Sequence, residues 1–204
     1  VEYPPLGVVG VIAPWNFPFH NIFCPVVPAL FAGNAVVVKV SEHTSWSAGP
    51  LVDVLRDVLR RRGHDPDLLQ IVTGYGDTGA ALVRSGVDKI FFTGSPQNGA
   101  KVMATASEGL VPVVLELGGK DPMIVCDDAD LDHAVSQAML GVFTACGQMC
   151  VGAERLYVVD AVYDRFLEKV KARVSALRQG PPLGDEIVDV GAMTMPGQLD
   201  ILDR

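Results

Sequence analysis

The chain has 204 residues, 49% of them hydrophobic, and a mean hydropathy of +0.31, so it can bury a sizeable core and form one domain or slightly more. Its net charge of −8 argues against a nucleic-acid partner, because basic residues cluster only at Arg60–Arg62. Its most apolar stretch, Asn21–Gly33, contains two prolines and is shorter than the roughly 20 residues of a spanning helix, which argues against a membrane span.

The seven predicted strands are short β-branched runs that alternate with helical patterns along the chain. This alternation is typical of an α/β fold with a mostly parallel sheet. In chain order the predicted strands are Val8–Ala13, Ala35–Val40, Leu69–Thr73, Lys89–Thr93, Val111–Leu115, Met123–Val125 and Arg155–Val159.

Two helices have clear apolar periodicity. The first has Thr44 as a candidate N-cap and Gly63 as its stop, and the second begins near Ala161. Their predicted core-facing stripes are Leu51, Val54, Leu55, Val58 and Leu59 in the first, and Val162, Phe166, Val170, Val174 and Leu177 in the second. Both helices are interpreted as scaffold.

Two motifs resemble the sequences of known binding loops. Gly74–Gly79 fits G-x-G-x-x-G, but no acidic residue follows about 20 residues later, so a tight strand-to-helix turn is favoured over a phosphate loop. Asp128, Asp130 and Asp132 alternate as in a calcium loop, yet the glycine and glutamate that such a loop needs are absent. Helix capping explains these aspartates better.

The four cysteines predict neither a disulfide framework nor a metal site. They stand at positions 24, 126, 146 and 150 of a chain without secretory features, which indicates a reducing, cytoplasmic compartment. Cys146 and Cys150 have no second Cys or His pair at zinc-ligand spacing. At this stage each cysteine can be a nucleophile or a small apolar packing residue.

Five segments, taken together and in order, resemble the NAD(P)-dependent aldehyde dehydrogenase superfamily over essentially the whole chain. The resemblance implies a partial Rossmann-like NAD-binding domain over residues 1–117, followed by the first part of an α/β catalytic domain over residues 118–204. The five segments are Pro14–Pro18, Lys39–Glu42, Phe92–Gly99, Glu116–Lys120 and Gly147–Cys150.

The resemblance implies three catalytic residues. Cys150 closes Gly-Gln-x-Cys and matches the family's nucleophile, while Cys146 is expected to pack on the preceding helix. Asn16 matches the side-chain donor to the oxyanion, and Glu116 matches the general base that activates water. Each residue also has a non-catalytic interpretation. Cys150 can be a buried inert cysteine, Asn16 can stabilise a turn, and Glu116 can be a salt-bridged structural residue.

The resemblance also implies NAD as the cofactor, with NADP as an alternative. Lys39 and Glu42 match the ribose-binding residues, and Glu42 should repel a 2′-phosphate. Ser95 as N-cap and Pro96 at the first helical position suit a helix whose N-terminus faces the pyrophosphate. The remaining cofactor-binding candidates are Trp15, Gly94, Gly99, Leu117 and Gly118. Pro25 stands where many relatives carry a lysine, so a proton relay through that lysine is not expected.

The family's chains are longer than this one, so we expect residues 1–204 to be a central fragment that is inactive alone. The implied substrate is a small-molecule aldehyde, oxidised to a carboxylic acid, and the implied parent protein is a homo-oligomer. Two rival interpretations remain: a CoA-acylating semialdehyde dehydrogenase, which usually lacks the glutamate that matches Glu116, and a truncated, non-catalytic member of the family.

Overall fold

The computed structural model describes residues 2–202 and divides the chain into two compact units, residues 1–118 and residues 119–204. The predicted α/β class with a parallel sheet is confirmed, since every strand pair is parallel. Within the described part of the chain, no helix is long and apolar enough to cross a membrane.

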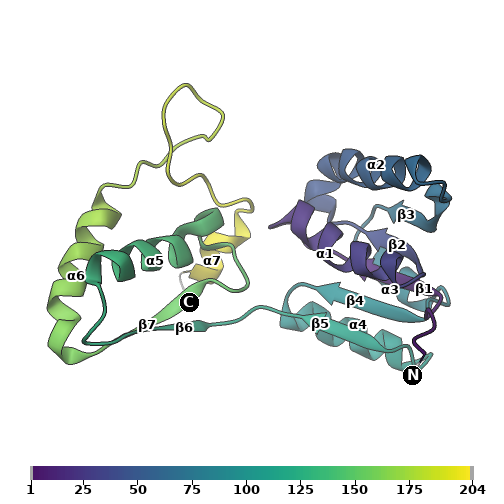
Figure 1. Ribbon diagram of the computed structural model, residues 1–204, viewed down its shortest axis with the longest axis horizontal. Coiled ribbons are helices and arrows are strands. Elements are labelled where there is room, and N and C mark those ends of the chain that lie inside the picture. Colours follow the sequence, from purple (N-terminus) through teal and green to yellow (C-terminus); the bar gives the residue numbers. More distant parts are fainter. Residues whose placement is uncertain (1, 203–204) are drawn as a thin grey trace. The chain divides into compact units, whose positions relative to one another are not determined.

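The first unit contains a five-stranded parallel sheet with strand order β3-β2-β1-β4-β5 (Figure 1). Val, Ile and Phe dominate these strands, as expected for a parallel sheet buried on both faces. The strands are β1 (Val8–Ile12), β2 (Ala35–Lys39), β3 (Leu69–Val72), β4 (Lys89–Thr93) and β5 (Val113–Glu116). All five lie within two residues of the predicted bounds.

Helices cover both faces of this sheet (Figure 1). One core cluster joins Ile22 and Val26 of α1 (Pro18–Phe31) and Val52 of α2 (Ser45–Arg61) to strands β1, β2 and β3. The other joins residues of α3 (Gly76–Arg84) and α4 (Pro96–Ser107) to the opposite face, where Ile90 is fully buried. Short 3-10 turns, Glu42–Thr44 (η1) and Pro66–Leu68 (η2), lie beside α2 and β3.

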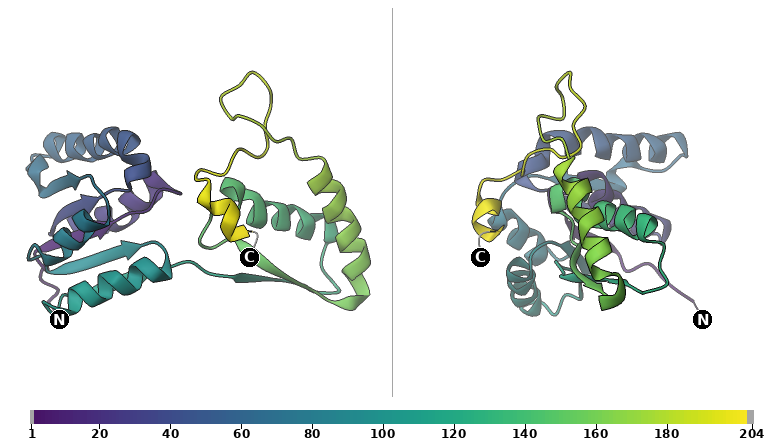
Figure 2. Two further views of the ribbon diagram at one scale, coloured as in Figure 1. Left: turned by 180° about the vertical axis from the view of Figure 1, so that it is seen from behind. Right: turned by 90° about the vertical axis from the view of Figure 1, so that its left-hand side faces the viewer.

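The second unit pairs β6 (Asp121–Val125) with β7 (Ala153–Val158) and packs α5 (Leu131–Phe143) and α6 (Asp160–Ser175) against them (Figure 2). A 3-10 turn, η3 (Thr144–Gly147), follows α5, and a long loop precedes the short helix α7 (Gly197–Leu202). Val162 and Phe166 form the buried stripe of α6 as predicted.

Several local predictions need correction. Thr44 stands at the N-cap of α2 but its side chain accepts no capping hydrogen bond there, because the preceding turn η1 already leads the backbone into the helix. Val54, Val58 and Val174 are exposed, since they lie at the edges of their stripes. The aspartate motif does cap a helix: Asp130 accepts from the backbone N–H groups of Asp132 and His133 at the start of α5.

The inner strand β4 offers a test of the packing. Replacing Ile90 by Ala should lower the free energy of unfolding by about 2–5 kcal/mol, because a fully buried side chain leaves a cavity between β4 and the helices. Phe31 has a side chain that is 91% exposed, so Phe31→Ala should change the free energy of unfolding by no more than about 0.5 kcal/mol. Denaturant unfolding of the full-length protein measures both, and equal effects would contradict the assigned core.

Candidate active site

The first unit has a topological switch point between its strands β1 and β4. These strands are parallel neighbours, but the chain continues from β1 toward β2 and β3, and from β4 toward β5 on the other side. Ligands of open α/β sheets bind at the carboxyl ends of such strands. The segment Pro14–Pro18 follows β1, and Gly94–Ser95 follows β4, so two of the predicted motifs flank this position.

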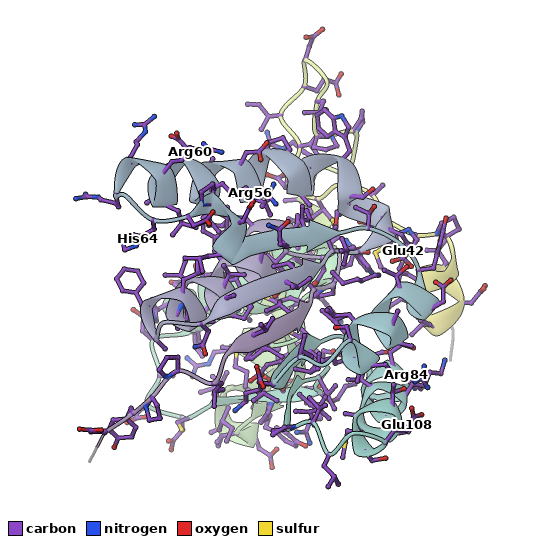
Figure 3. The ribbon with its side chains drawn as sticks, turned by 90° about the vertical axis from the view of Figure 1, so that its right-hand side faces the viewer. Glu42, Arg56, Arg60, His64, Arg84 and Glu108 are labelled. Carbon is purple, nitrogen blue, oxygen red and sulfur yellow. The ribbon has the colours of Figure 1, made fainter. Side chains whose placement is uncertain are left out.

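Lys39 and Glu42 form an ion pair at the carboxyl end of β2. The Lys39 Nζ lies 3.2 Å from Glu42 Oε2, and the lysine side chain is only 8% exposed. Glu42 is more open, at 30%, and its Oε1 lies 3.9 Å from His43 Nε2. Figure 3 shows Glu42 beside the first turn of α2. Burial alone would leave the lysine charge uncompensated, and the neighbouring Glu42 carboxylate provides the opposite charge.

The pKa of the Glu42 carboxyl lies below its usual value. Burial of the side chain acts in the opposite direction and raises the pKa. A hydrogen bond from the residue's own backbone, the hydrogen bond and charge of Lys39, and the charge of His43 outweigh that effect. The carboxylate is therefore ionised at neutral pH, and both of its oxygens can accept hydrogen bonds from hydroxyls.

The helix α4 begins next to the switch point. Ser95 caps it by accepting the backbone N–H of Asn98 at 3.3 Å, and Pro96 occupies the first turn, both as predicted. Gly94 lies against the ring of Phe92, where a Cβ atom would come within 2.6 Å of the ring. The positive end of the α4 dipole is thus placed at the carboxyl edge of the sheet, which suits an anionic group.

Gly99 and Leu117 have a packing contact with each other. A Cβ atom on Gly99 would lie 2.8 Å from a Leu117 methyl carbon, so the glycine lets α4 approach the end of β5 closely. This contact accounts for the glycine independently of any cofactor. Gly118 is exposed, and a Cβ atom there would meet no atom of the described residues within 4 Å.

Glu116 is the last residue of β5 and is exposed. It is in register with Thr93 of β4, and its backbone carbonyl accepts the N–H of Gly94 at 3.0 Å. The carboxylate therefore lies at the same sheet edge as the start of α4. None of the described ion pairs involves Glu116, so the salt-bridged structural role has no support here.

Asn16 follows Trp15 in the segment after β1, and both residues are half-buried. The side-chain carbonyl of Asn16 accepts a hydrogen bond from Asn21 Nδ2 at 3.2 Å. Sequence reasoning missed Asn21, although a signal was present: it is a polar residue on the face of α1 that also carries buried Ile22, Pro25 and Val26.

Cys150 lies in the second unit, in an exposed turn between η3 and β7. The N–H of Gly152 closes this turn on the carbonyl of Met149 at 3.1 Å. Gly119 passes close to it, since a Cβ atom on Gly119 would lie 3.2 Å from the Cys150 carbonyl oxygen. The alternative interpretation of Cys150 as a buried, inert thiol is not supported by this exposure.

Cys146 does not lie on the preceding helix, contrary to the prediction. The helix α5 ends at Phe143, and both Ala145 and Cys146 have left-handed backbone angles, with φ of 52° and 60°. Cys146 is half-buried, and its thiol donates to the carbonyl of Gly191 at 3.3 Å. It is therefore a structural residue of the loop that precedes Cys150.

Gln148 is a second residue whose contacts the sequence did not reveal. Its Nε2 donates to the carbonyl of Ala145 at 2.8 Å, and its Oε1 accepts the backbone N–H of Thr194 at 2.9 Å. Together with the bond from Cys146 to Gly191, these contacts fasten the cysteine loop to residues 191–194. Gly191 and Thr194 lie more than 40 positions from Cys146 and Gln148, so no local pattern indicates these two contacts.

The structure thus places the predicted residues in two groups. The first unit holds Trp15, Asn16, Lys39, Glu42, Gly94, Ser95, Gly99, Glu116, Leu117 and Gly118, and the second holds Cys150. The four cysteines are free, and among the described residues no cluster of three or more His, Cys, Asp or Glu side chains could hold a metal ion.

The sheet order, the switch point and the capped helix define a Rossmann-like α/β protein of the dinucleotide-binding class. The chain belongs to the aldehyde dehydrogenase family, which matches residues 1–204. It is 43% identical to an aldehyde dehydrogenase-like protein of Schizosaccharomyces pombe, over 100% of this chain and 39% of that protein. It is 44% identical to the 4,4′-diapolycopene aldehyde oxidase of a Methylomonas species, over 99% of this chain and 37% of the relative.

Among solved structures, PnpE in complex with nicotinamide adenine dinucleotide superimposes with a TM-score of 0.90 at 36% identity. The match covers 98% of this chain and 40% of PnpE. The chain therefore spans about two fifths of the length of the proteins that it matches.

The depressed pKa of Glu42 predicts a pH-dependent contribution to stability. A carboxyl whose pKa is lower in the folded state stabilises the protein above its unfolded pKa, and this stabilisation is lost as the pH falls through the folded value. The wild type should therefore be more stable than Glu42→Gln at neutral pH, and the difference should shrink below about pH 4.5.

Denaturant midpoints of the full-length protein at several pH values measure this difference. Glu168→Gln is the control, because Glu168 is exposed on α6. A difference between wild type and Glu42→Gln that stays constant from neutral to acidic pH would show that the charge of Glu42 does not cause it.

Proposed function

We propose that the full-length protein oxidises an aldehyde to a carboxylic acid with NAD, through a thioester on Cys150. The observation that carries this proposal is the arrangement of the first unit, where the Lys39–Glu42 pair, the start of α4 and the Glu116 carboxylate lie at the carboxyl edge of one parallel sheet. Membership of the aldehyde dehydrogenase family supports the reaction class.

The residues at the sheet edge fit an adenine dinucleotide by their chemistry. Glu42 would accept hydrogen bonds from ribose hydroxyls, and Lys39 would hold that carboxylate in place. The N-terminus of α4, at Ser95, would face the pyrophosphate. An ionised Glu42 repels a 2′-phosphate, which favours NAD over NADP. A bound nicotinamide would accept the hydride that leaves the substrate carbon.

The acylation half of the reaction is assigned to Cys150 and Asn16. The Cys150 thiolate adds to the aldehyde carbon, the carbonyl π bond breaks, and the oxygen becomes an alkoxide. Asn16 donates its side-chain N–H to that oxygen. Departure of hydride from the same carbon then restores the C=O bond and leaves a thioester on Cys150. The exposed turn that carries Cys150 is open to a small-molecule substrate.

The hydrolysis half is assigned to Glu116. Its carboxylate takes a proton from a water molecule as the water oxygen adds to the thioester carbon, and collapse of the tetrahedral adduct releases the acid and the Cys150 thiolate. An acylating enzyme that passes the acyl group to CoA needs no such base, so an exposed Glu116 at the strand end favours hydrolysis.

The first test separates the two neighbouring cysteines. In the full-length protein Cys150→Ser should lower aldehyde-dependent NADH formation at least about 100-fold, because a serine hydroxyl is ionised far less readily than a thiol. Cys146→Ser keeps a donor for the Gly191 carbonyl and should retain most of the activity. Absorbance at the NADH band measures both rates. Loss of activity in Cys146→Ser but not in Cys150→Ser would overturn the assignment.

The second test concerns the order of the two half-reactions. Glu116→Gln should release about one equivalent of NADH per site and then stall, with the acyl group detectable as a mass increase on Cys150. Glu108→Gln is a matched control, since Glu108 is an exposed carboxylate of the same unit paired with Arg84 (Figure 3). Undiminished steady turnover of Glu116→Gln would refute the role of Glu116, and rescue by added CoA would favour acyl transfer.

A further inference from the structure

His43 is a second cationic neighbour of Glu42. The two carboxylate oxygens of Glu42 have different partners, since Oε2 lies 3.2 Å from Lys39 Nζ and Oε1 lies 3.9 Å from His43 Nε2. A separation of 3.9 Å is too long for a hydrogen bond, so the imidazole acts on Oε1 through its charge. Burial raises the pKa of the Glu42 carboxyl, and the charge of His43 is among the effects that bring it below its usual value.

The two cationic partners differ in accessibility. The Lys39 side chain is 8% exposed, whereas that of His43 is 45% exposed, so a ligand group at Oε1 would meet the imidazole. The turn η1 also packs against α2, but the first two turns of α2 carry no charged residue. Asp53, the first one along the helix, pairs with Arg56. The charges around the Glu42 carboxylate are therefore those of Lys39 on β2 and His43 on η1.

Of these charges, the one on the imidazole responds to pH in the ordinary range. Histidine side chains gain or lose their proton between about pH 5 and pH 8. The Glu42 carboxyl has a pKa below 4.5 and stays ionised throughout this range. The charges of Lys39 and Glu42 cancel, so the three side chains together are neutral when the imidazole is neutral and carry one positive charge when it is protonated.

We propose that His43 is a specificity-determining residue whose protonation controls how strongly the site discriminates between NAD and NADP. This inference rests on the proposed function. NADP differs from NAD by a 2′-phosphate, and such a group carries a charge of about −1.5 to −2 at neutral pH. While the imidazole is neutral, Glu42 repels this phosphate. A protonated imidazole beside Oε1 offsets the carboxylate charge and attracts the phosphate, so NADP is accepted more readily as the pH falls.

Two substitutions fix the charge at position 43. Glutamine is polar and neutral at every pH, and lysine stays positive throughout the range in which histidine titrates. Neither change removes the bond that the backbone N–H of His43 donates to Ser41 Oγ at 3.3 Å, so the turn η1 is retained. Because NAD has a neutral 2′-hydroxyl, both His43→Gln and His43→Lys should keep the wild-type affinity for NAD within about twofold.

Calorimetric titration of the full-length protein with NAD and with NADP gives the ratio of the two Kd values. At pH 8 the ratio of the NADP to the NAD Kd should be the same in wild type and His43→Gln, and about fivefold lower in His43→Lys. At pH 5.5 the wild type should match His43→Lys and lie about fivefold below His43→Gln. Because the proteins are compared at one pH, protonation of the 2′-phosphate itself affects all of them alike.

His64 provides the matched control. It is exposed and follows the C-terminal end of α2, whereas Glu42 lies before the first turn of that helix (Figure 3). His64→Gln should leave the Kd ratio within about twofold of wild type at both pH values. Equal effects of His43→Gln and His64→Gln at pH 5.5 would show that the overall charge of the protein causes the change, and would contradict a role of position 43.

The outcomes separate this inference from the proposed function. If the wild-type full-length protein bound neither NAD nor NADP at either pH, the proposed cofactor site itself would be refuted. If it bound NAD, but wild type, His43→Gln and His43→Lys had the same Kd ratio at pH 5.5, only the role of His43 would be refuted.

Discussion

The parallel arrangement of the first unit's sheet is the constraint on which the candidate site depends. Because all neighbouring strands run in the same direction, each strand must end at the same edge, and the chain returns through a helix before the next strand begins. Segments that are separate in the sequence, after β1, β2, β4 and β5, therefore meet along one line. Burial of both sheet faces by helices makes this arrangement rigid.

Buried polar groups at this edge are stabilised in pairs, and each pair contains a residue with a proposed chemical role. Lys39 is nearly buried and bonds the more exposed Glu42, while Asn21 is buried and donates a hydrogen bond to the half-buried Asn16. In both cases the less accessible partner is held by regular secondary structure and the more accessible partner lies beyond its end. A buried polar group that loses its hydrogen-bond partner lowers the stability of the fold, so the pairs resist rearrangement.

The cysteine loop of the second unit is organised differently. No regular element carries Cys150, and the loop instead depends on two residues in left-handed conformations and on bonds from Cys146 and Gln148 to residues 191–194. Loops carry reactive groups because they can present them to solvent, but they need such supports to hold a geometry. Cys146, which looked like a rival nucleophile, is one of these supports.

Much of the fold could be predicted from the sequence, because the signals are local. The β-branched runs define the strands, Ser95 and Pro96 mark the start of α4, and Asp130 marks the start of α5. The family motifs place Cys150, Glu116 and Asn16 on a chain that resembles aldehyde dehydrogenases, without any knowledge of their surroundings.

Only the tertiary structure decided which side chains meet. The contacts from Gln148 to Thr194 and from Cys146 to Gly191 join residues more than 40 positions apart, and the placement of Glu116 beside Gly94 follows from strand register. The left-handed turn that removes Cys146 from helix α5 has no local signature, since Ala and Cys rarely adopt it unless long-range contacts stabilise it. The amino-acid sequence by itself determined the elements and the reactive groups, and the packing of distant segments determined their orientation.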